Sequence, residues 1–148
     1  MRVAVMVATF LAGVALPLAG QGSVDPVFGY WETQNRRAIV EIAPCGAEAC
    51  GRLVWIAEPV DDRGAVKRDA DGRPLCGIGL VSGLRRAEPG RWEDGEIYNP
   101  RDGRTYSARV EARDTRRLEV RGYAGIQLFG KSQIWTRAAG DRGGCASG

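Results

Sequence analysis

The stretch RGYAGIQLFGKSQIWTR, Arg121–Arg137, combines a strand-like alternation of side chains with unusually frequent glycines. Its second half, 131–137, places three side chains on one face of an extended strand: Gln133, Trp135 and Arg137. Glycine inside a strand pattern marks a sharp bend or a close approach of another backbone, and here the glycines are Gly122, Gly125 and Gly130. Strands of a closed barrel must coil strongly, which corner glycines permit. The stretch therefore predicts the last strand pair of a β-barrel, with an apolar corner or lid formed by Ile126, Leu128 and Phe129.

The rest of the chain repeats the two-residue period of a half-buried strand. Side chains alternate between two faces in Arg37–Ala43, Arg104–Ala112 and Arg116–Gly122. In Gly51–Ala57 both faces are apolar, with Leu53 and Trp55 on one and Val54 and Ile56 on the other. Turn residues separate these runs, and in NPRDGR Pro100 presets φ while Gly103 can adopt a positive φ. No amphipathic helical pattern of ten residues or more follows the N-terminal segment. Seven or eight short strands with tight turns indicate an all-β fold, an antiparallel sandwich or barrel.

The first 22 residues have the pattern of a secretory signal peptide. Arg2 is followed by an apolar run that has no further charge until Asp25, and small residues follow Pro17. No basic stop-transfer cluster comes next, so the signal peptide is favoured over a transmembrane anchor. We therefore expect a signal peptide at 1–22, a barrel domain at 23–138 and a flexible tail at 139–148. An exported protein, periplasmic or extracellular and bacterial, is the corresponding localisation, with no stable membrane insertion after removal of the signal.

Charge and composition narrow the classes of function. Removal of the signal leaves 20 Lys+Arg (21 minus Arg2) against 18 Asp+Glu, a balance that gives no electrostatic case for nucleic acid. Histidine is absent, which removes the commonest general base and the commonest metal ligand. We accordingly expect no enzyme, no cofactor and no metal site.

Four cysteines follow the signal segment, and an exported compartment permits disulfides. Cys45 and Cys50 are separated only by GAEA between two alternating apolar runs, so a cross-strand disulfide is predicted. Cys76 with Cys145 is possible by elimination, and this pairing stays open. No C-x-x-C pair suggests zinc.

Two acidic segments invite a functional reading. Asp69-x-Asp71-Gly72 faintly resembles a calcium loop, but the twelfth position counted from Asp69 is Leu80 instead of a carboxylate. A solvated turn is expected there. A charged turn is also expected at three neighbouring acids, Glu93, Asp94 and Glu96.

The start of the first strand and the end of the last suggest a family. Gly29-Tyr30-Trp31 together with Arg137 resembles the lipocalin and wider calycin signature, in which the tryptophan plugs one end of the barrel and the arginine lies across it. The segments GYWET, IVEIAPC, CGRLVW, RPLCGIGLVSGLR, GEIYNPRDGRTYSARV and LEVRGYAGIQLFGKSQIWTR, in this order, resemble the domain-of-unknown-function family 2147 of small exported bacterial proteins. The likeness covers Phe28 to Arg137. It implies an antiparallel up-and-down, lipocalin-like β-barrel of about eight strands with no established activity, and with Trp31 and Arg137 in the structural role.

Analogy with that fold leads to a functional hypothesis. We expect a small apolar or amphipathic ligand, such as a lipid or fatty acid, to bind inside the barrel at the end away from Trp31 and Arg137. The ligand-binding residues would be Tyr106, Ala108, Val110, Leu118, Val120 and Phe129. Four aromatic residues either line a pocket or fill the core: Tyr98, Tyr106, Tyr123 and Trp135.

Two alternatives remain open. A barrel filled by its own side chains would be a structural or protein-interaction factor of the bacterial envelope. An enzyme that uses carboxylate and tyrosine without histidine is the third hypothesis. The sequence determines neither the ligand nor the oligomeric state.

Overall fold

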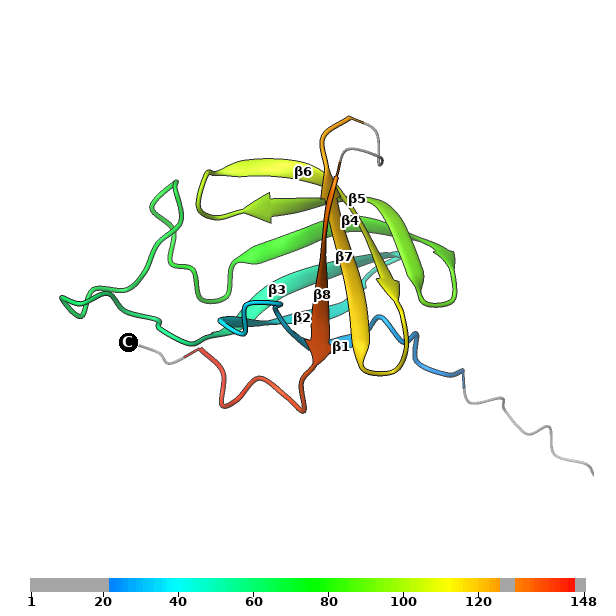
Figure 1. Ribbon diagram of the computed structural model, residues 1–148, viewed down its shortest axis with the longest axis horizontal. Helices are drawn as coiled ribbons and strands as arrows, with labels where there is room; N and C mark the ends of the chain where they lie inside the picture. Colours follow the sequence, from blue (N-terminus) through cyan, green and yellow to red (C-terminus); the bar gives the residue numbers. More distant parts are fainter. Residues whose placement is uncertain (1–21, 126–129, 146–148) are drawn as a thin grey trace, which may run out of the picture.

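The computed structural model describes residues 22–125 and 130–145, and within them eight antiparallel strands close into one barrel (Figure 1). Each strand pairs with the next along the chain and the last pairs with the first. The strands are β1 (Gly29–Glu32), β2 (Ala38–Cys45), β3 (Glu48–Ile56), β4 (Gly79–Glu88), β5 (Arg91–Asn99), β6 (Arg104–Ala112), β7 (Arg117–Tyr123) and β8 (Lys131–Arg137). The predicted all-β, antiparallel up-and-down barrel of about eight strands is confirmed.

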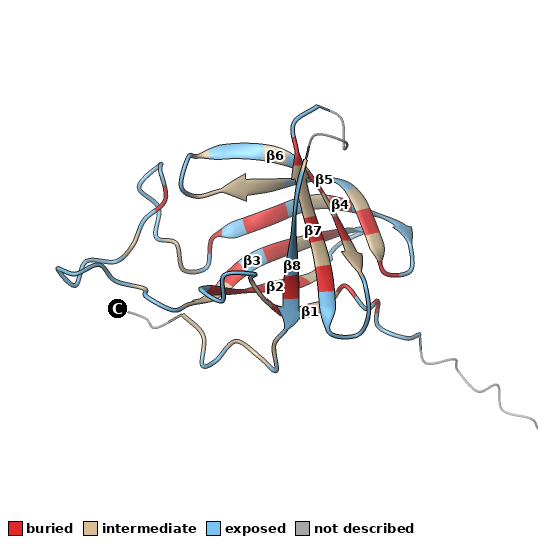
Figure 2. Ribbon diagram, viewed as in Figure 1, coloured by how far each residue is buried: buried red, intermediate tan, exposed pale blue. Residues whose placement is uncertain are grey.

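Alternation of side chains along the strands builds the core, because successive residues of a strand point to opposite faces of the sheet. On β6, Ala108 and Val110 have no exposed surface, whereas Arg109 and Glu111 lie half-buried on the outside. Buried positions recur as separate bands along the neighbouring strands (Figure 2). The largest fully buried side chains of the core cluster are Trp31, Ile42, Leu84, Leu118, Val27, Val40 and Val110.

The first and last strands meet at one end of the barrel, the closed end. Trp31 is fully buried, and its indole Nε1 donates to the Val27 carbonyl at 2.8 Å. The Arg137 guanidinium lies over the Trp31 ring, with Cζ 4.0 Å from the ring centroid. Its nitrogens donate to the carbonyls of Pro26, Phe28 and Thr115. Arg137 thus links the N-terminal segment, β8 and the β6–β7 turn, and partial burial lowers the pKa of a guanidinium that stays charged.

The glycines of the 121–137 stretch show the two uses that the sequence suggested. Gly125 has φ of 77°, which suits the bend after β7. A Cβ on Gly130 would lie 2.6 Å from the Gly122 carbonyl oxygen, so the close approach of the two chain segments requires glycine. The expected apolar corner of Ile126, Leu128 and Phe129 lies outside the described residues.

The prediction of a charged turn at Glu93, Asp94 and Glu96 is wrong, because all three residues lie within β5. The pairing of β5 with β6 shifts register between Trp92 and Gly95, and Asp94 has φ of 59°. Asp-Gly is typical of tight turns because these residues tolerate positive φ. A β-bulge uses the same conformation in mid-strand, so the local signal does not separate the two.

Gly95 provides a first testable prediction, since this bulge leaves no room for a side chain. A Cβ here would lie 2.6 Å from the Ser82 carbonyl oxygen and 2.8 Å from two carbons of Leu84. We expect Gly95→Ala to lower the free energy of unfolding by about 1 kcal/mol, the lower part of the range for overpacking. Urea denaturation measures this, with Gly79→Ala as the control, because nothing lies within 4 Å of a Cβ there. Equal losses in both variants would contradict the steric explanation.

Two disulfides fasten the chain outside the core. Cys45–Cys50 spans the β2–β3 hairpin with Cα atoms 5.8 Å apart, the pairing suggested by the sequence. Cys76–Cys145 joins the chain just before β4 to the C-terminal segment, with Cα atoms 5.6 Å apart. The pairing of Cys76 with Cys145, which the sequence left open, is therefore formed.

The C-terminal segment leaves the end of β8 and returns along the barrel wall, running to the left below β2 and β3 in Figure 1. The Ala138 amide donates to the Tyr30 carbonyl at 2.9 Å. Arg142 pairs with Glu32 at 3.1 Å and lies over the Trp55 ring at 4.7 Å. Glu32 and Trp55 are the register neighbours of Ile39, which has no exposed surface. Residues 138–145 thus cover the outer face of β1–β3, where the sequence suggested a flexible tail.

Among the described residues, no helix is long and apolar enough to cross a membrane. Residues 1–21, nearly all of the expected signal peptide, lie outside the described part of the chain.

Candidate functional site: the open mouth of the barrel

The end of the barrel opposite Trp31 and Arg137 carries two adjoining hollows. In an up-and-down barrel, the β1–β2, β3–β4, β5–β6 and β7–β8 connections all lie at this end, and all four contribute to it. We call the hollow of about 660 Å³ the aromatic hollow and that of about 620 Å³ the polar hollow. The residues common to both are Asn35, Asn99, Pro100, Arg101 and Gln133. The β5–β6 loop therefore stands between two parts of one mouth.

The aromatic hollow has an apolar floor and aromatic walls. Trp135 and Val120 are each 3% exposed yet line it, so they form its floor together with Leu80. Further apolar and aromatic groups stand around them: Ile97, Tyr98, Tyr106 and Tyr123. The Trp135 indole donates to the Gln133 side-chain oxygen at 2.9 Å, which satisfies its polar atom. The arrangement suits a guest with an apolar body.

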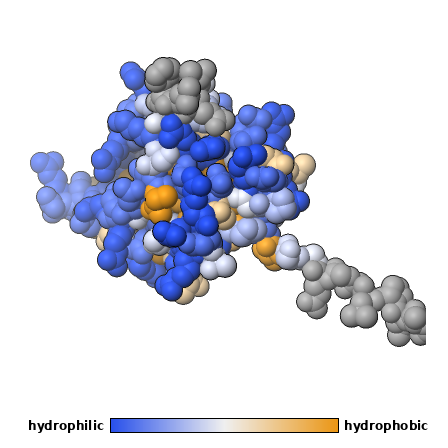
Figure 3. All heavy atoms as spheres, turned by 45° about the vertical axis from the view of Figure 1, so that its right-hand side comes forward, coloured by the Kyte–Doolittle hydropathy of each residue, from blue (hydrophilic) through white to orange (hydrophobic). Residues whose placement is uncertain are grey.

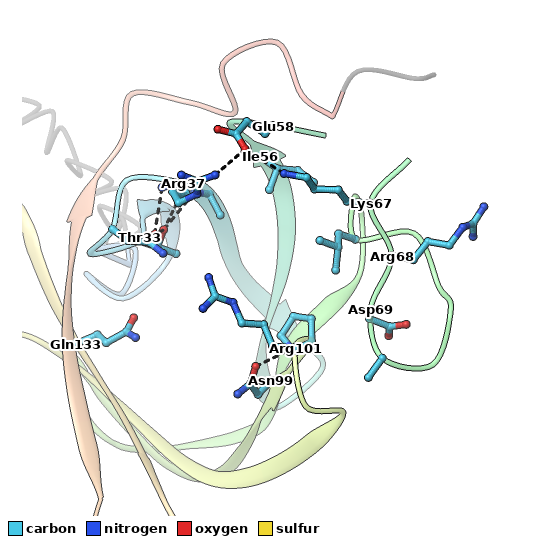
Figure 4. Close-up of a pocket in the computed structure, with 15 residues that line it drawn as sticks. Thr33, Arg37, Ile56, Glu58, Lys67, Arg68, Asp69, Asn99, Arg101 and Gln133 are labelled. Carbon is cyan, nitrogen blue, oxygen red and sulfur yellow. Dashed lines mark hydrogen bonds and ion pairs between the residues drawn. The ribbon is translucent and has the colours of Figure 1, made fainter. Parts of the chain in front are cut away.

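The carboxylates that line the polar hollow, Glu58 and Asp69, are already paired (Figure 4). Glu58 accepts from Arg37 at 2.7 Å and from Lys67 at 3.1 Å. The hydrogen bond from Lys67 and the charge of Arg37 lower the pKa of this carboxyl. These exposed pairs position the start of the β3–β4 loop against the β1–β2 turn.

Asp69 holds the β3–β4 loop in place. The sequence predicted that it lies in a solvated turn, and this prediction is wrong. Its side chain has no exposed surface, and it accepts from the amides of Asp71 and Arg73 at 3.0 and 2.7 Å. Arg73 Nε and the Tyr98 hydroxyl also donate to it, at 2.8 and 2.9 Å. Burial alone would raise the pKa of Asp69, but the donors from Arg73 and Tyr98 outweigh burial and the pKa is lowered. The loop contacts are thus lost only as the pH falls through that lowered pKa.

The same loop is attached to the β5–β6 loop by its backbone. The Ala70 amide donates to the Pro100 carbonyl at 2.9 Å. Since Tyr98 belongs to β5, Asp69 and Ala70 together fix the wall of the polar hollow against the loop that divides the mouth. A local sequence pattern gives no sign of this contact, because Asp69 and Tyr98 are 29 residues apart.

Arg101, like Lys131, differs from the paired charged residues of the mouth. Its guanidinium has no hydrogen bond or ion pair within residues 22–125 and 130–145, and it extends from the β5–β6 loop into the hollow (Figure 4). Arg68, by contrast, points away from the hollow in the same view. The neighbouring Asp102 accepts from Asn99, the Arg104 amide and the Tyr106 hydroxyl at 3.1, 2.8 and 3.0 Å. A cation without a partner thus lies where the two hollows meet.

The structure places the six predicted ligand-binding residues in different surroundings. Tyr106 and Val120 line the aromatic hollow. Ala108, Val110 and Leu118 have no exposed surface and line neither hollow. Phe129 lies outside the described residues. The ligand site therefore stays a prediction, now centred on the half of the barrel nearest the mouth.

Sequence reasoning singled out the four aromatic residues, and all of them line the aromatic hollow. It missed Arg101, although this residue stands at the tip of the NPRDGR turn that was assigned a purely conformational role. An arginine between Pro100 and Asp102 is an ordinary surface residue in sequence terms. Residues 22–125 and 130–145 contain no cluster of three acidic or cysteine side chains placed to hold a metal ion.

Comparison with known proteins gives one family and one related structure. The family model described as "Uncharacterized protein conserved in bacteria (DUF2147)" matches residues 29–137. A solved structure described as "Protein HP1028 from the human pathogen Helicobacter pylori belongs to the lipocalin family" is 20% identical, with a TM-score of 0.61, and the match covers 78% of this chain and 85% of that chain. At this identity the likeness shows the fold, a lipocalin-like barrel. Among curated proteins, none matches this sequence.

Proposed function

This chain belongs to the DUF2147 family of proteins conserved in bacteria, and we propose that its lipocalin-like barrel binds a small apolar or amphipathic molecule in the mouth. The observation that carries the proposal is the aromatic hollow. Its volume of about 660 Å³ lies within the ~300–1,000 Å³ of small-molecule sites. Its apolar floor beside a few polar groups is the usual composition of such sites.

The filled half of the barrel bears on the alternative, a solid structural or protein-interaction factor. Side chains occupy the interior near the closed end, where Val110 and Leu118 are fully buried. A protein-docking surface, however, would be expected to show a contiguous apolar patch. The face in Figure 3 is mainly hydrophilic, and the large exposed apolar residues of the described chain are few: Val24, Ile134 and the bridged pair Val60 and Val66. The mouth therefore favours a binding protein.

Catalysis is no part of the proposal. The two carboxyls that line the polar hollow, Glu58 and Asp69, are engaged by cationic partners, and both have lowered pKa values. A general acid needs a raised pKa near the working pH. The protein would act by binding alone, without cofactor or nucleic acid.

Export completes the proposal. Two disulfides are typical of an oxidising compartment outside the cytoplasm. Together with the signal-like residues 1–22, they support a periplasmic or extracellular location for the mature chain.

A matched pair of tryptophan substitutions tests the proposed function. Ile97→Trp places an indole in the wall of the aromatic hollow, whereas Ile134→Trp makes the same change on the exposed strand β8. With the neutral fluorescent probe N-phenyl-1-naphthylamine, we expect wild type and Ile134→Trp to bind alike and Ile97→Trp to bind about tenfold more weakly. Circular dichroism checks that both variants fold. A wild-type protein that binds no apolar probe would refute the proposal and favour the solid barrel.

A further inference from the structure

We propose that the mouth selects compact amphiphiles that carry one carboxylate, with the carboxylate bound by Arg101 and the apolar part in the aromatic hollow. This inference rests on the proposed function, because it names the ligand class of the same site.

Arg101 supplies an unpaired positive charge at the junction of the two hollows. It lines both hollows, and its guanidinium has no hydrogen bond or ion pair among the described residues. Planar guanidinium groups bind carboxylates through two parallel hydrogen bonds, and such charge-assisted pairs are about twice as strong as neutral ones. A ligand carboxylate at the junction of the hollows would supply the partner that the protein lacks there.

The acidic groups of the mouth do not compete for Arg101. Asp102 is engaged by three donors, Asp69 by Arg73 and Tyr98, and Glu58 by Arg37 and Lys67. Lys131 adds a second positive charge to the lining of the aromatic hollow. The local field therefore favours an anion over a neutral or cationic head group.

The depth of the aromatic hollow limits the apolar part of the ligand. Gly122 and Val120 of β7 both line it, and two residues of strand extend over about 7 Å. Leu118, the next inward residue, has no exposed surface. A ring or a short acyl chain fits above this floor, and the closely packed core leaves no space for a long chain to continue toward Trp31.

Octanoate and octanol, which share a chain length and differ in charge, test the head-group preference by calorimetry. We expect wild type to bind octanoate at least about tenfold more tightly than octanol. Arg101→Gln should remove most of this preference, since only the charge of Lys131 then remains in the lining of the aromatic hollow, and Arg101→Lys should retain more of it. Arg104→Gln is the control, because Arg104 belongs to the same hairpin and lines neither hollow. This variant should prefer octanoate over octanol as strongly as wild type does. Hexadecanoate should bind no more tightly than octanoate.

The outcomes separate this inference from the proposed function. The neutral naphthylamine probe should bind Arg101→Gln as it binds wild type, since it needs only the aromatic hollow. Equal affinity for octanoate and octanol, while the probe still binds, would overturn the carboxylate preference and leave the binding function standing. An equal loss in Arg104→Gln would overturn the specific role of Arg101. Tighter binding of hexadecanoate than of octanoate would overturn the size limit.

Discussion

Replacement of both Cys76 and Cys145 by serine is expected to lower the free energy of unfolding by about 4 kcal/mol. The disulfide spans 69 residues of chain, so it removes much of the conformational entropy of the unfolded state. It also holds residues 138–145 over Ile39 and Trp55. Urea denaturation of the double variant under oxidising conditions measures the change in the free energy of unfolding.

The other disulfide is the control for this prediction. Cys45 and Cys50 are only 5 residues apart, and the same loop-entropy relation assigns their bond about 2 kcal/mol. The double serine variant at these positions should therefore lose about half as much stability. If the two double variants lost the same free energy of unfolding, the stabilisation by each disulfide would not depend on the length of chain that it closes.

Substitution of Arg137 by alanine is expected to lower the free energy of unfolding by about 2–3 kcal/mol. The guanidinium donates to the carbonyls of Pro26, Phe28 and Thr115 and covers the buried Trp31 ring. Its loss leaves three carbonyls without their donor and opens the closed end to water. The midpoint of urea denaturation should fall accordingly, while binding of the naphthylamine probe at the opposite end should be unchanged.

Arg142 offers a matched control, since it also lies over an indole ring, that of Trp55, at 4.7 Å. Its hydrogen-bond partner is the side chain of Glu32 instead of a set of backbone carbonyls, so Arg142→Ala should lose less than about 1 kcal/mol. Arg137→Lys keeps the charge but not the planar fork, and we expect most of the stability to be lost in it as well. If Arg137→Lys kept the urea midpoint of the wild type, the positive charge alone would be sufficient to stabilise the closed end.

The amino-acid sequence by itself determined the features that depend on local pattern. The two-residue alternation in Arg104–Ala112 and Arg116–Gly122 specifies which side chains face the core, because strand geometry fixes the period. Cys45 and Cys50 could be paired because a short hairpin leaves their sulfurs few alternatives. The aromatic residues of the mouth could be identified, but not separated from core filler.

Local pattern also misled where one conformation serves two structures. The acids around Gly95 resemble a turn, yet the partner strands extend past them and convert the same positive φ into a β-bulge. Asp69 resembles a solvated residue until Tyr98 is placed beside it. Pairing with distant strands supplies the information that is missing in both cases.

The tertiary structure alone decided where the barrel is filled and where it is open. Eight strands bring side chains to each level of the interior, so the space left at a level depends on their register and summed volumes. Val110 and Leu118 are therefore sealed, while Val120, two residues from Leu118 on the same strand, borders a hollow. Arg101 likewise became a candidate ligand-binding residue only when each carboxylate near it was seen to have another partner, because charge balance at a site is a property of the assembled fold.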